Sequence, residues 1–461
     1  MEKLTSQDAS FLRMESPHCP FHVAGLMIFK PPAGANANYL RQLAHKCGRL
    51  NELWPVFNKK LSNPRNLSDA GWVPADDYLP ERHVFHYALP GPGTGRMADL
   101  LQLVTRAHER PLDWSRPLWE LHVIEGLPEG KFALYCKLHH ALADGVAAMK
   151  MIQTLLAPSP AHKLDFDEQR PVIDRHSAHH SLFETLGDLG KGLQKQYKAI
   201  PELSRLLAHM GADALRGKED VMRLPHTAPR SILNRELDSC RSIATCDLPL
   251  SGVRKLARDS GGTINDVLVS VCGGALRVYL QGQRALPRSS LVAGMPVSLK
   301  TGDDSGSNKI TYISAPFFTN EGNPLRRLQR VIKVTRQAKA ELGKVSVTAA
   351  EDFYALIMAP VILLTVTGNT ERVPPSTNAI FSNVPGSRQK LYLEGAELEA
   401  LYPLSIVTDG MGLNITVVSH ANKLCFALVS CPTHLPGIGE LGKLIRASYR
   451  ELRSAASDSP G

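Results

Sequence analysis

The stretch 134-LYCKLHHALADGVAAM-149 decides the fold, because two adjacent histidines end an apolar run and an Asp-Gly pair follows shortly after. The run 131–138 is short, apolar and contains aromatic residues, which predicts a strand. Apolar residues then recur at helical spacing, at Val146, Met149, Ile152 and Leu156. We therefore expect a strand, a tight loop and a helix, with His139 and His140 at the end of the strand.

The length and composition describe an ordinary globular protein with more than one core. A chain of 461 residues favours two domains of roughly 150–220 residues each. Its residues are 43% hydrophobic and 21% charged. No run approaches the roughly 20 apolar residues that cross a bilayer. The N-terminus lacks the features of a secretory signal, so the sequence predicts a cytoplasmic protein.

Cysteine usage and charge narrow the classes of partner. The eight cysteines are scattered without C-x-x-C spacing, which argues against a zinc knuckle and against a disulfide scaffold. The net charge of +9 favours anionic partners, namely nucleic acid, membrane headgroups or a phosphorylated cofactor. Nucleic acid is the least supported, because aromatic residues make up only 6% and no dense basic block contains them.

Strand and helix patterns alternate in both halves of the chain. Strands are expected at 21–29, 131–138, 243–248, 290–296, 310–317, 379–381, 413–418 and 424–429, and helices at 97–108, 252–260 and 267–280. Residues 158–230 show no strand pattern but carry two helical apolar stripes, at 182–200 and 203–210. The predicted fold class is α/β, with two similar mixed domains at 1–160 and 242–461 joined by a helical connection at 161–241.

One long apolar run, 355-ALIMAPVILLTV-366, is too short to span a bilayer and contains a central proline. It fits a buried core helix. The alternative is a wall that contacts an apolar substrate or a membrane surface.

The histidine pair has three interpretations. A metal site is disfavoured, because neighbouring side chains at the end of a strand point to opposite faces and the i, i+4 spacing of helical ligands is absent. Coincidence is disfavoured, because the pattern H-H-x-x-x-D-G arises only rarely by chance. General base catalysis remains, since an imidazole accepts and returns a proton near neutral pH.

In the general-base interpretation one histidine is the base, and the other helps to fix the turn by a hydrogen bond. Asp144 is expected to hold the loop through an ion pair with an arginine elsewhere, and Gly145 to permit a tight exit into the helix. The sequence has no G-x-S-x-G motif, so a serine nucleophile is unsupported. The base is therefore expected to activate an external nucleophile directly.

The stretch from His139 to Gly145 matches the HHxxxDG signature of the coenzyme A-dependent acyltransferase superfamily, which includes chloramphenicol acetyltransferase, carnitine acyltransferases and peptide-synthetase condensation domains. An ordered set of motifs resembles the bacterial wax ester synthase/diacylglycerol acyltransferase family, and these are Leu4-Thr-Ser6-Gln-Asp8-Ala-Ser-Phe11, Pro117-Leu118-Trp119, Asn265-Asp266, 294-GMPVSL-299 and Asn383-Val384-Pro385-Gly386. The resemblance runs from about residue 4 to 452. HHxxxDG alone identifies only the superfamily, whereas the ordered set points to the family.

The resemblance implies a role for each matching position. The second histidine of the motif, His140, is the general base, and His139, Asp144 and Gly145 support its loop. The two halves enclose a substrate tunnel, and Asn265, supported by Asp266, lies across it. The Asn265 amide either donates to the developing oxyanion or positions a substrate, and the alternative is an asparagine that only caps the helix near residue 267. For 117–119 and 383–386 we expect structural roles, in packing and in a Pro-Gly turn.

The implied reaction moves a long-chain acyl group from acyl-coenzyme A to a fatty alcohol or to diacylglycerol. It needs no metal, no cofactor and no covalent acyl-enzyme. The positive net charge is compatible with binding coenzyme A phosphates and an anionic membrane surface. We therefore expect a cytoplasmic protein that associates with the inner membrane or lipid bodies. Two alternatives remain open: an acyltransferase with a different alcohol or amine acceptor, and a lipid-binding relative without catalysis.

Overall fold

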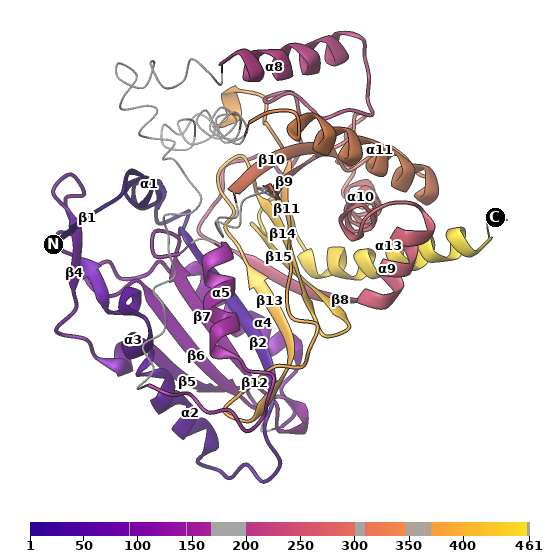
Figure 1. Cartoon of the computed structure of the whole chain (residues 1–461). Coiled ribbons are helices and arrows are strands. Elements are labelled where there is room, and N and C mark those ends of the chain that lie inside the picture. Colours follow the sequence, from indigo (N-terminus) through magenta and orange to yellow (C-terminus); the bar gives the residue numbers. More distant parts are fainter. Residues whose placement is uncertain are drawn as a thin grey trace. The chain divides into compact units, whose positions relative to one another are not determined.

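The computed structural model of the chain describes residues 1–91, 93–143, 145–166, 200–299, 309–346, 353, 364 and 370–458 (Figure 1). The chain divides into two compact units, and each is assembled from segments that are distant in sequence. Unit 1 comprises Met1–Arg175, Val384–Ile406 and Val417–Ala427. Unit 2 comprises His176–Asn383, Val407–Thr416 and Leu428–Gly461.

The first six-stranded sheet carries the histidine pair. Its strand order is β12 (Tyr392–Leu393), β13 (Ala396–Leu404), β2 (His22–Lys30), β7 (Phe132–His139), β6 (Trp119–Glu125) and β5 (Val84–Ala88). All neighbours are antiparallel except β5 and β6, which are parallel. Strand β7 therefore lies in the interior of the sheet, and its last residue, His139, is paired with His22.

The two faces of β7 have different partners. The side chains of Leu134, Cys136 and Leu138 line an apolar cavity together with residues of α5 (Gly145–Leu155), and Figure 1 shows α5 lying across the sheet. On the alternate positions, the Lys137 ammonium reaches the carbonyl of Ala107 in α4 (Met97–Glu109). Because successive strand residues point to opposite faces, α5 and α4 cover opposite sides of β7.

The remaining elements of unit 1 frame this sheet. They are the helices α1 (Ser6–Met14), α2 (Tyr39–Cys47) and α3 (Leu50–Leu53), the short helices η1 (Pro55–Asn58), η2 (Pro80–Arg82) and η3 (Pro128–Gly130), and a three-stranded sheet ordered β1 (Glu2–Lys3), β4 (Gly71–Pro74), β3 (Lys59–Leu61). Helix α1 begins at a capping box, in which Thr5 accepts from the backbone of Asp8 and Asp8 accepts in return.

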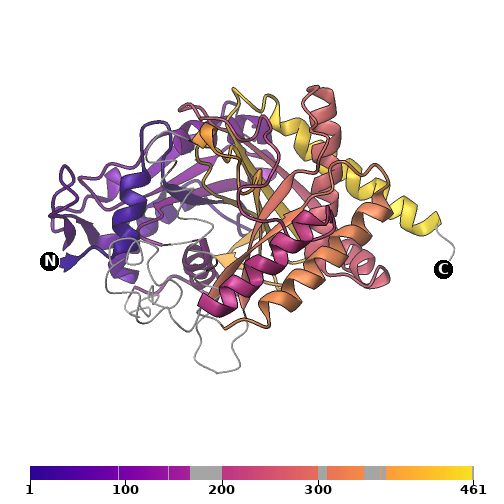
Figure 2. The same ribbon diagram turned by 90° about the horizontal axis from the view of Figure 1, so that it is seen from above.

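The second six-stranded sheet has the order β10 (Lys309–Pro316), β9 (Val292–Leu299), β11 (Ala379–Val384), β14 (Leu413–His420), β15 (Lys423–Ser430), β8 (Ser242–Pro249). Unit 2 adds α8 (Ile200–Leu215), α9 (Leu250–Asp259), α10 (Ile264–Gly282), α11 (Pro324–Leu342), α13 (Ile438–Asp458) and the short helix η5 (Thr370–Arg372). Helices α8 and α11 run side by side (Figure 2), with His209 4.0 Å from Glu341.

Helix α10 packs unusually closely because of its glycines. A Cβ on Gly273 would lie 2.0 Å from the carbonyl oxygen of Phe317, and one on Gly274 would lie 2.3 Å from Ser448 Oγ in α13. Only glycine permits these approaches. The helix is accordingly buried along most of its length, with Val267, Val271 and Leu276 fully inaccessible, and it forms the core of unit 2.

Most expected elements are present, and the differences have local causes. All eight expected strands occur, as β2, β7, β8, β9, β10, β11, β14 and β15. The helix expected at 267–280 begins earlier, because a capping box starts it at Ile264. The second helical stripe is confirmed as α8. The stripe at 182–200 lies outside the described residues except for Ile200, as does the run 355–366 except for Leu364. The expected domain boundaries stay a prediction.

Among the described helices, none is long and apolar enough on its own to cross a membrane. The pair α9 and α10 passes on length and composition only when taken together, and it is bent by 102°.

Candidate active site

Backbone hydrogen bonds on both sides hold the histidine pair at the end of β7. The His139 N–H donates to the Leu118 carbonyl over 2.9 Å, and the His140 N–H donates to the Phe21 carbonyl over 2.9 Å. The chain then turns sharply, and the Leu142 N–H donates back to the His139 carbonyl over 2.9 Å. Both imidazoles therefore extend from backbone that is fixed to neighbouring segments.

The His139 ring is completely buried and forms part of the turn. Its Nδ1 accepts a hydrogen bond from the Ala141 N–H over 3.0 Å. An Nδ1 that accepts leaves the ring proton on Nε2, and Nε2 faces Glu15 Oε2 at 3.4 Å. The contact within the turn that we expected from one of the two histidines is thus made by His139.

Glu15 is the residue that the sequence did not reveal. It directly follows α1, and its side chain is almost fully buried. Besides facing His139, it accepts hydrogen bonds from the Phe21 N–H and from Trp114 Nε1, each over 2.7 Å. Burial raises the pKa of the Glu15 carboxyl, but His139 above all, together with the Phe21 N–H and Trp114, outweighs burial and holds the pKa below its ordinary value. Glu15 is therefore an ionised anchor behind the turn.

The His140 ring lies against aromatic side chains. Its centroid is 4.4 Å from that of Phe11 in α1, in an edge-on arrangement, and 6.0 Å from that of Phe21. Phe11 closes the N-terminal motif that the sequence singled out, so the capped helix α1 supplies a wall of the His140 environment. Apolar walls limit the orientations open to the imidazole.

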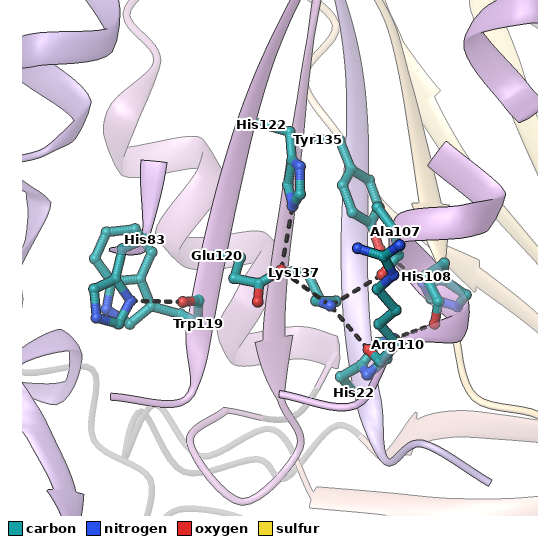
Figure 3. Close-up of polar contacts among 10 residues, drawn as sticks. All are labelled: His22, His83, Ala107, His108, Arg110, Trp119, Glu120, His122, Tyr135 and Lys137. Carbon is teal, nitrogen blue, oxygen red and sulfur yellow. Dashed lines mark hydrogen bonds and ion pairs between the residues drawn. The ribbon is translucent and has the colours of Figure 1, made fainter. Parts of the chain in front are cut away.

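A buried polar network lies behind the turn, between β7 and α4 (Figure 3). The Lys137 ammonium donates to the carbonyls of Ala107 and Arg110, each over 3.0 Å, and lies 3.1 Å from Glu120 Oε2. Burial lowers the pKa of Lys137, and the Glu120 carboxylate opposes this effect. The carbonyls belong to the last turn of α4 and to the residue after it, so Lys137 ties the end of that helix to the sheet.

Neutral histidines surround this network. His22 Nε2 contacts the His108 carbonyl over 2.9 Å, and His122 Nε2 lies 3.3 Å from Glu120 Oε2 (Figure 3). Burial lowers the pKa of His22 well below its ordinary value and also lowers the pKa of His122. The face of β7 that carries His139 is therefore polar, with the Lys137 ammonium beside the Glu120 carboxylate.

The rest of the HHxxxDG motif is only partly described. Asp144 lies outside the described residues, so its expected ion pair stays a prediction. Gly145 is the first residue of α5 and is exposed. Its φ is not in the left-handed region, and among the described residues a Cβ there would meet no atom within 4 Å. The expected role of Gly145 in a tight exit into the helix stays a prediction.

In unit 2, Asn265 and Asp266 form the start of α10. Thr263 caps the helix, and the buried Asp266 completes the capping box by accepting from the Thr263 N–H over 2.7 Å. Asp266 also accepts from the Thr335 hydroxyl of α11 over 2.6 Å. Asn265 itself does not cap the helix, so that alternative is wrong. The Asn265 amide oxygen instead accepts a hydrogen bond from Asn383 Nδ2.

The motifs at 117–119 and 383–386 have structural contacts, as expected. Trp119 is completely buried and donates from Nε1 to the Phe57 carbonyl over 2.9 Å, while Leu118 supplies the carbonyl that holds His139. A Cβ on Gly386 would lie 1.9 Å from the Ser419 carbonyl oxygen, so only glycine fits there. Within the described ranges, no group of three or more histidine, cysteine, aspartate or glutamate residues is placed to hold a metal ion.

The fold is shared with a solved condensation domain. It resembles the starter condensation domain of rhizomide synthetase, with a TM-score of 0.57 over 99% of this chain and 94% of that one. At 14% identity this likeness concerns the fold alone. The chain thus has a fold of the class that condensation domains share.

Sequence similarity then identifies the family. Residues 4–268 match the wax ester synthase/diacylglycerol acyltransferase catalytic domain, and residues 306–453 match the WS/DGAT C-terminal domain. The chain belongs to the wax ester synthase/diacylglycerol acyltransferase family and is an acyltransferase. This confirms the resemblance that the ordered motifs indicated.

Individual relatives match over nearly the full length. A protein of Mycobacterium tuberculosis named as a probable diacylglycerol O-acyltransferase is 35% identical, over 99% of both chains. The O-acyltransferase WSD of Acinetobacter baylyi is 33% identical, over 96% of this chain and 94% of that one. The wax ester synthase/diacylglycerol acyltransferase structure from Marinobacter aquaeolei VT8 has a TM-score of 0.78 at 31% identity, covering 99% and 100% of the two chains.

The anchor role of Glu15 predicts the effect of Glu15→Gln. A neutral amide has one acceptor oxygen for three donors, so we expect the unfolding free energy to fall by about 1–3 kcal/mol and kcat to fall about tenfold or more as the turn shifts. Because the pKa of Glu15 is lowered in the folded state, Glu15 stabilises the fold at pH values above the ordinary glutamate pKa. This stabilisation is lost as the pH falls through the lowered, folded-state pKa.

The measurement is urea unfolding of both proteins from pH 7 to pH 3.5, with acyl-transfer rates at pH 7. The stability gap between wild type and Glu15→Gln should narrow below about pH 4.5. Glu52→Gln, at an exposed ion pair on α3, is the matched control and should change neither quantity. Equal stability of wild type and Glu15→Gln at pH 7 contradicts the anchor role.

Proposed function

We propose that the enzyme transfers a long-chain fatty acyl group from acyl-coenzyme A to a long-chain fatty alcohol, giving a wax ester, or to diacylglycerol, giving triacylglycerol. One observation carries the choice of a long acyl chain. The cavity between α5 and the first sheet is lined only by apolar side chains, among them Met27, Trp54, Leu138 and Ile152. Leu138, which lines the cavity, directly precedes the histidine pair in sequence.

In the proposed mechanism His140 is the general base. Its imidazole removes the hydroxyl proton of the acceptor as the hydroxyl oxygen attacks the thioester carbonyl carbon. The tetrahedral intermediate then collapses, the C–S bond breaks, and the imidazolium returns the proton to the coenzyme A thiolate. His139 is built into the turn, with Nδ1 accepting from the Ala141 N–H and Nε2 facing Glu15 at 3.4 Å, which supports assigning proton transfer to its neighbour.

Asn265 is proposed to stabilise the oxyanion of the intermediate through its amide N–H groups. Its position is supported by the capping box and by Asp266, which fix the first turn of α10. Asp144 and Gly145 are proposed to support the His140 loop. The substrate tunnel that the family resemblance implies stays a prediction.

The proposed reaction proceeds without a metal, a cofactor or a covalent acyl-enzyme, and acyl-coenzyme A is a substrate. A different alcohol or an amine as acceptor is the alternative within the same chemistry. Every acceptor attacks the thioester with His140 as base and releases the coenzyme A thiol. The rate of thiol release with different acceptors therefore distinguishes these alternatives.

The general-base assignment predicts that His140→Ala lowers acceptor-dependent thiol release from palmitoyl-coenzyme A by about 10²–10⁴-fold. The assay supplies hexadecanol and dipalmitoylglycerol in parallel, and the faster acceptor defines the main activity. His45→Ala, on the exposed surface of α2, is the matched control and should retain the wild-type rate. If folded His140→Ala releases thiol at the wild-type rate, the base assignment is ruled out. If the wild type releases no thiol with either lipid, both acceptors are ruled out.

The cavity predicts that Ala148→Phe shifts the acyl-chain preference toward shorter chains. Ala148 is buried on α5 and lines the cavity, so a benzyl group there occupies space proposed for the acyl tail. Each methylene excluded costs about 0.8 kcal/mol of binding, and the ratio of kcat/KM for palmitoyl- over lauroyl-coenzyme A should fall at least about tenfold. Gln153→Phe, on the exposed face of α5, should leave the ratio unchanged. An unchanged ratio in Ala148→Phe places the acyl chain elsewhere.

We further propose that the protein is cytoplasmic and associates peripherally with the inner membrane or lipid bodies, where both apolar substrates are found. The net charge of +9 supports this, since basic residues are attracted to anionic lipid headgroups. In flotation, vesicles with phosphatidylglycerol should carry the protein upward at low salt and release it at high salt. Protein that stays at the bottom with these vesicles contradicts the association.

A further inference from the structure

The amide of Asn265 is held in one orientation by a neighbouring strand. Asn265 is the second residue of α10 and is half-buried. Asn383, near the C-terminal end of β11, directs its Nδ2 toward Asn265 Oδ1 and donates a hydrogen bond to it. Both residues belong to unit 2, so this pair is part of one compact body.

The direction of this hydrogen bond determines what Asn265 offers to a substrate. An asparagine side chain has one acceptor oxygen and one NH₂ group with two donors. When Oδ1 accepts from Asn383, the NH₂ group of Asn265 points away from the pair. Within the described part of the chain, no hydrogen bond from Asn265 Nδ2 is formed, so its donors are available to a ligand.

The backbone of Asn265 is fixed independently of this pair. Asp266 accepts from the Thr263 N–H and hydroxyl and from the Thr335 hydroxyl, which locks the first turn of α10 onto α11. With the backbone held, rotation of the terminal amide is the freedom that remains. A half-turn about this bond exchanges Oδ1 and Nδ2, which would present a lone pair where a donor had been.

We propose that Asn383 is a positioning residue for the acyl-transfer reaction, because its hydrogen bond to Asn265 Oδ1 orients the Asn265 amide with its donors toward the developing oxyanion. This inference rests on the proposed function, in which Asn265 stabilises the oxyanion. It gives Asn383, the first residue of the Asn-Val-Pro-Gly motif, a role beyond the turn. Asn383 and Asn265 are far apart in sequence, so the spacing of the motifs does not reveal that they meet.

Comparing Asn383→Ala with Asn383→Asp tests the orientation. Alanine removes the donor and lets the Asn265 amide rotate, so kcat should fall by about 3–10-fold. A carboxylate can only accept, so Asn265 must turn its NH₂ group toward it and present Oδ1 to the oxyanion. The kcat of Asn383→Asp should therefore be at least about tenfold below that of Asn383→Ala. The KM for palmitoyl-coenzyme A should stay within about twofold, because the oxyanion forms only after binding.

The double variant Asn265→Ala/Asn383→Asp separates orientation from a direct effect of the new charge. If Asn383 acts through Asn265, the double variant has the kcat of Asn265→Ala, which should lie about 10²-fold below wild type. If the carboxylate repels the oxyanion directly, the double variant is slower still, and the proposal is overturned. Asn323→Asp, where the N-cap of α11 accepts equally well with either side chain, should retain wild-type kcat.

The outcomes distinguish this inference from the proposed function. A wild-type kcat in Asn265→Ala overturns the oxyanion assignment and the Asn383 role with it. A large loss in Asn265→Ala, together with Asn383→Asp as active as Asn383→Ala, overturns only the Asn383 role. Thermal midpoints verify folding of each variant. If Asn383→Asp does not fold, Asn383→Leu removes the donor at similar volume, and wild-type kcat in that variant overturns the inference.

Discussion

The buried carboxylate of Glu15 joins the segments that surround the histidine pair. It accepts from Phe21, the residue before β2, and from Trp114 in the loop after α4, and it faces His139 at the end of β7. A carboxylate that is removed from water without such donors would be strongly destabilising. The Ala141 N–H fixes the proton of His139 on Nε2 by donating to Nδ1, so that Nε2 faces Glu15, and the turn that carries His140 is built on that ring.

Strand β7 separates two environments. On one face, Leu134, Cys136 and Leu138 line the apolar cavity proposed to hold the acyl chain. On the other face, Lys137 and His139 are completely inaccessible and are held by carbonyls and carboxylates. Burying an ammonium is costly unless it is paired and hydrogen-bonded, and here three oxygen partners offset the cost. The same strand thus provides an apolar wall and a rigid polar support for the catalytic turn.

Sequence reasoning located the motif elements and missed their long-range partners. The short apolar run at 131–138 and the helical spacing after it predicted β7 and α5, because both signals are local. Glu15 was not found, since nothing near it in sequence indicates that it meets His139. Asn265 was misjudged as a helix cap in one alternative, although Thr263 and Asp266 have the spacing of a capping box. Strand β13 joins the first sheet from the other half of the chain, which local patterns do not reveal.

The central claim is direct acyl transfer, with His140 activating the acceptor rather than an enzyme nucleophile. The most direct test mixes stoichiometric enzyme with palmitoyl-coenzyme A in the absence of acceptor and follows thiol release in a stopped-flow instrument. Direct transfer predicts no burst, and rapid release only after hexadecanol or dipalmitoylglycerol is added. A burst of thiol equal to the enzyme concentration without acceptor would show a covalent acyl-enzyme and contradict the account.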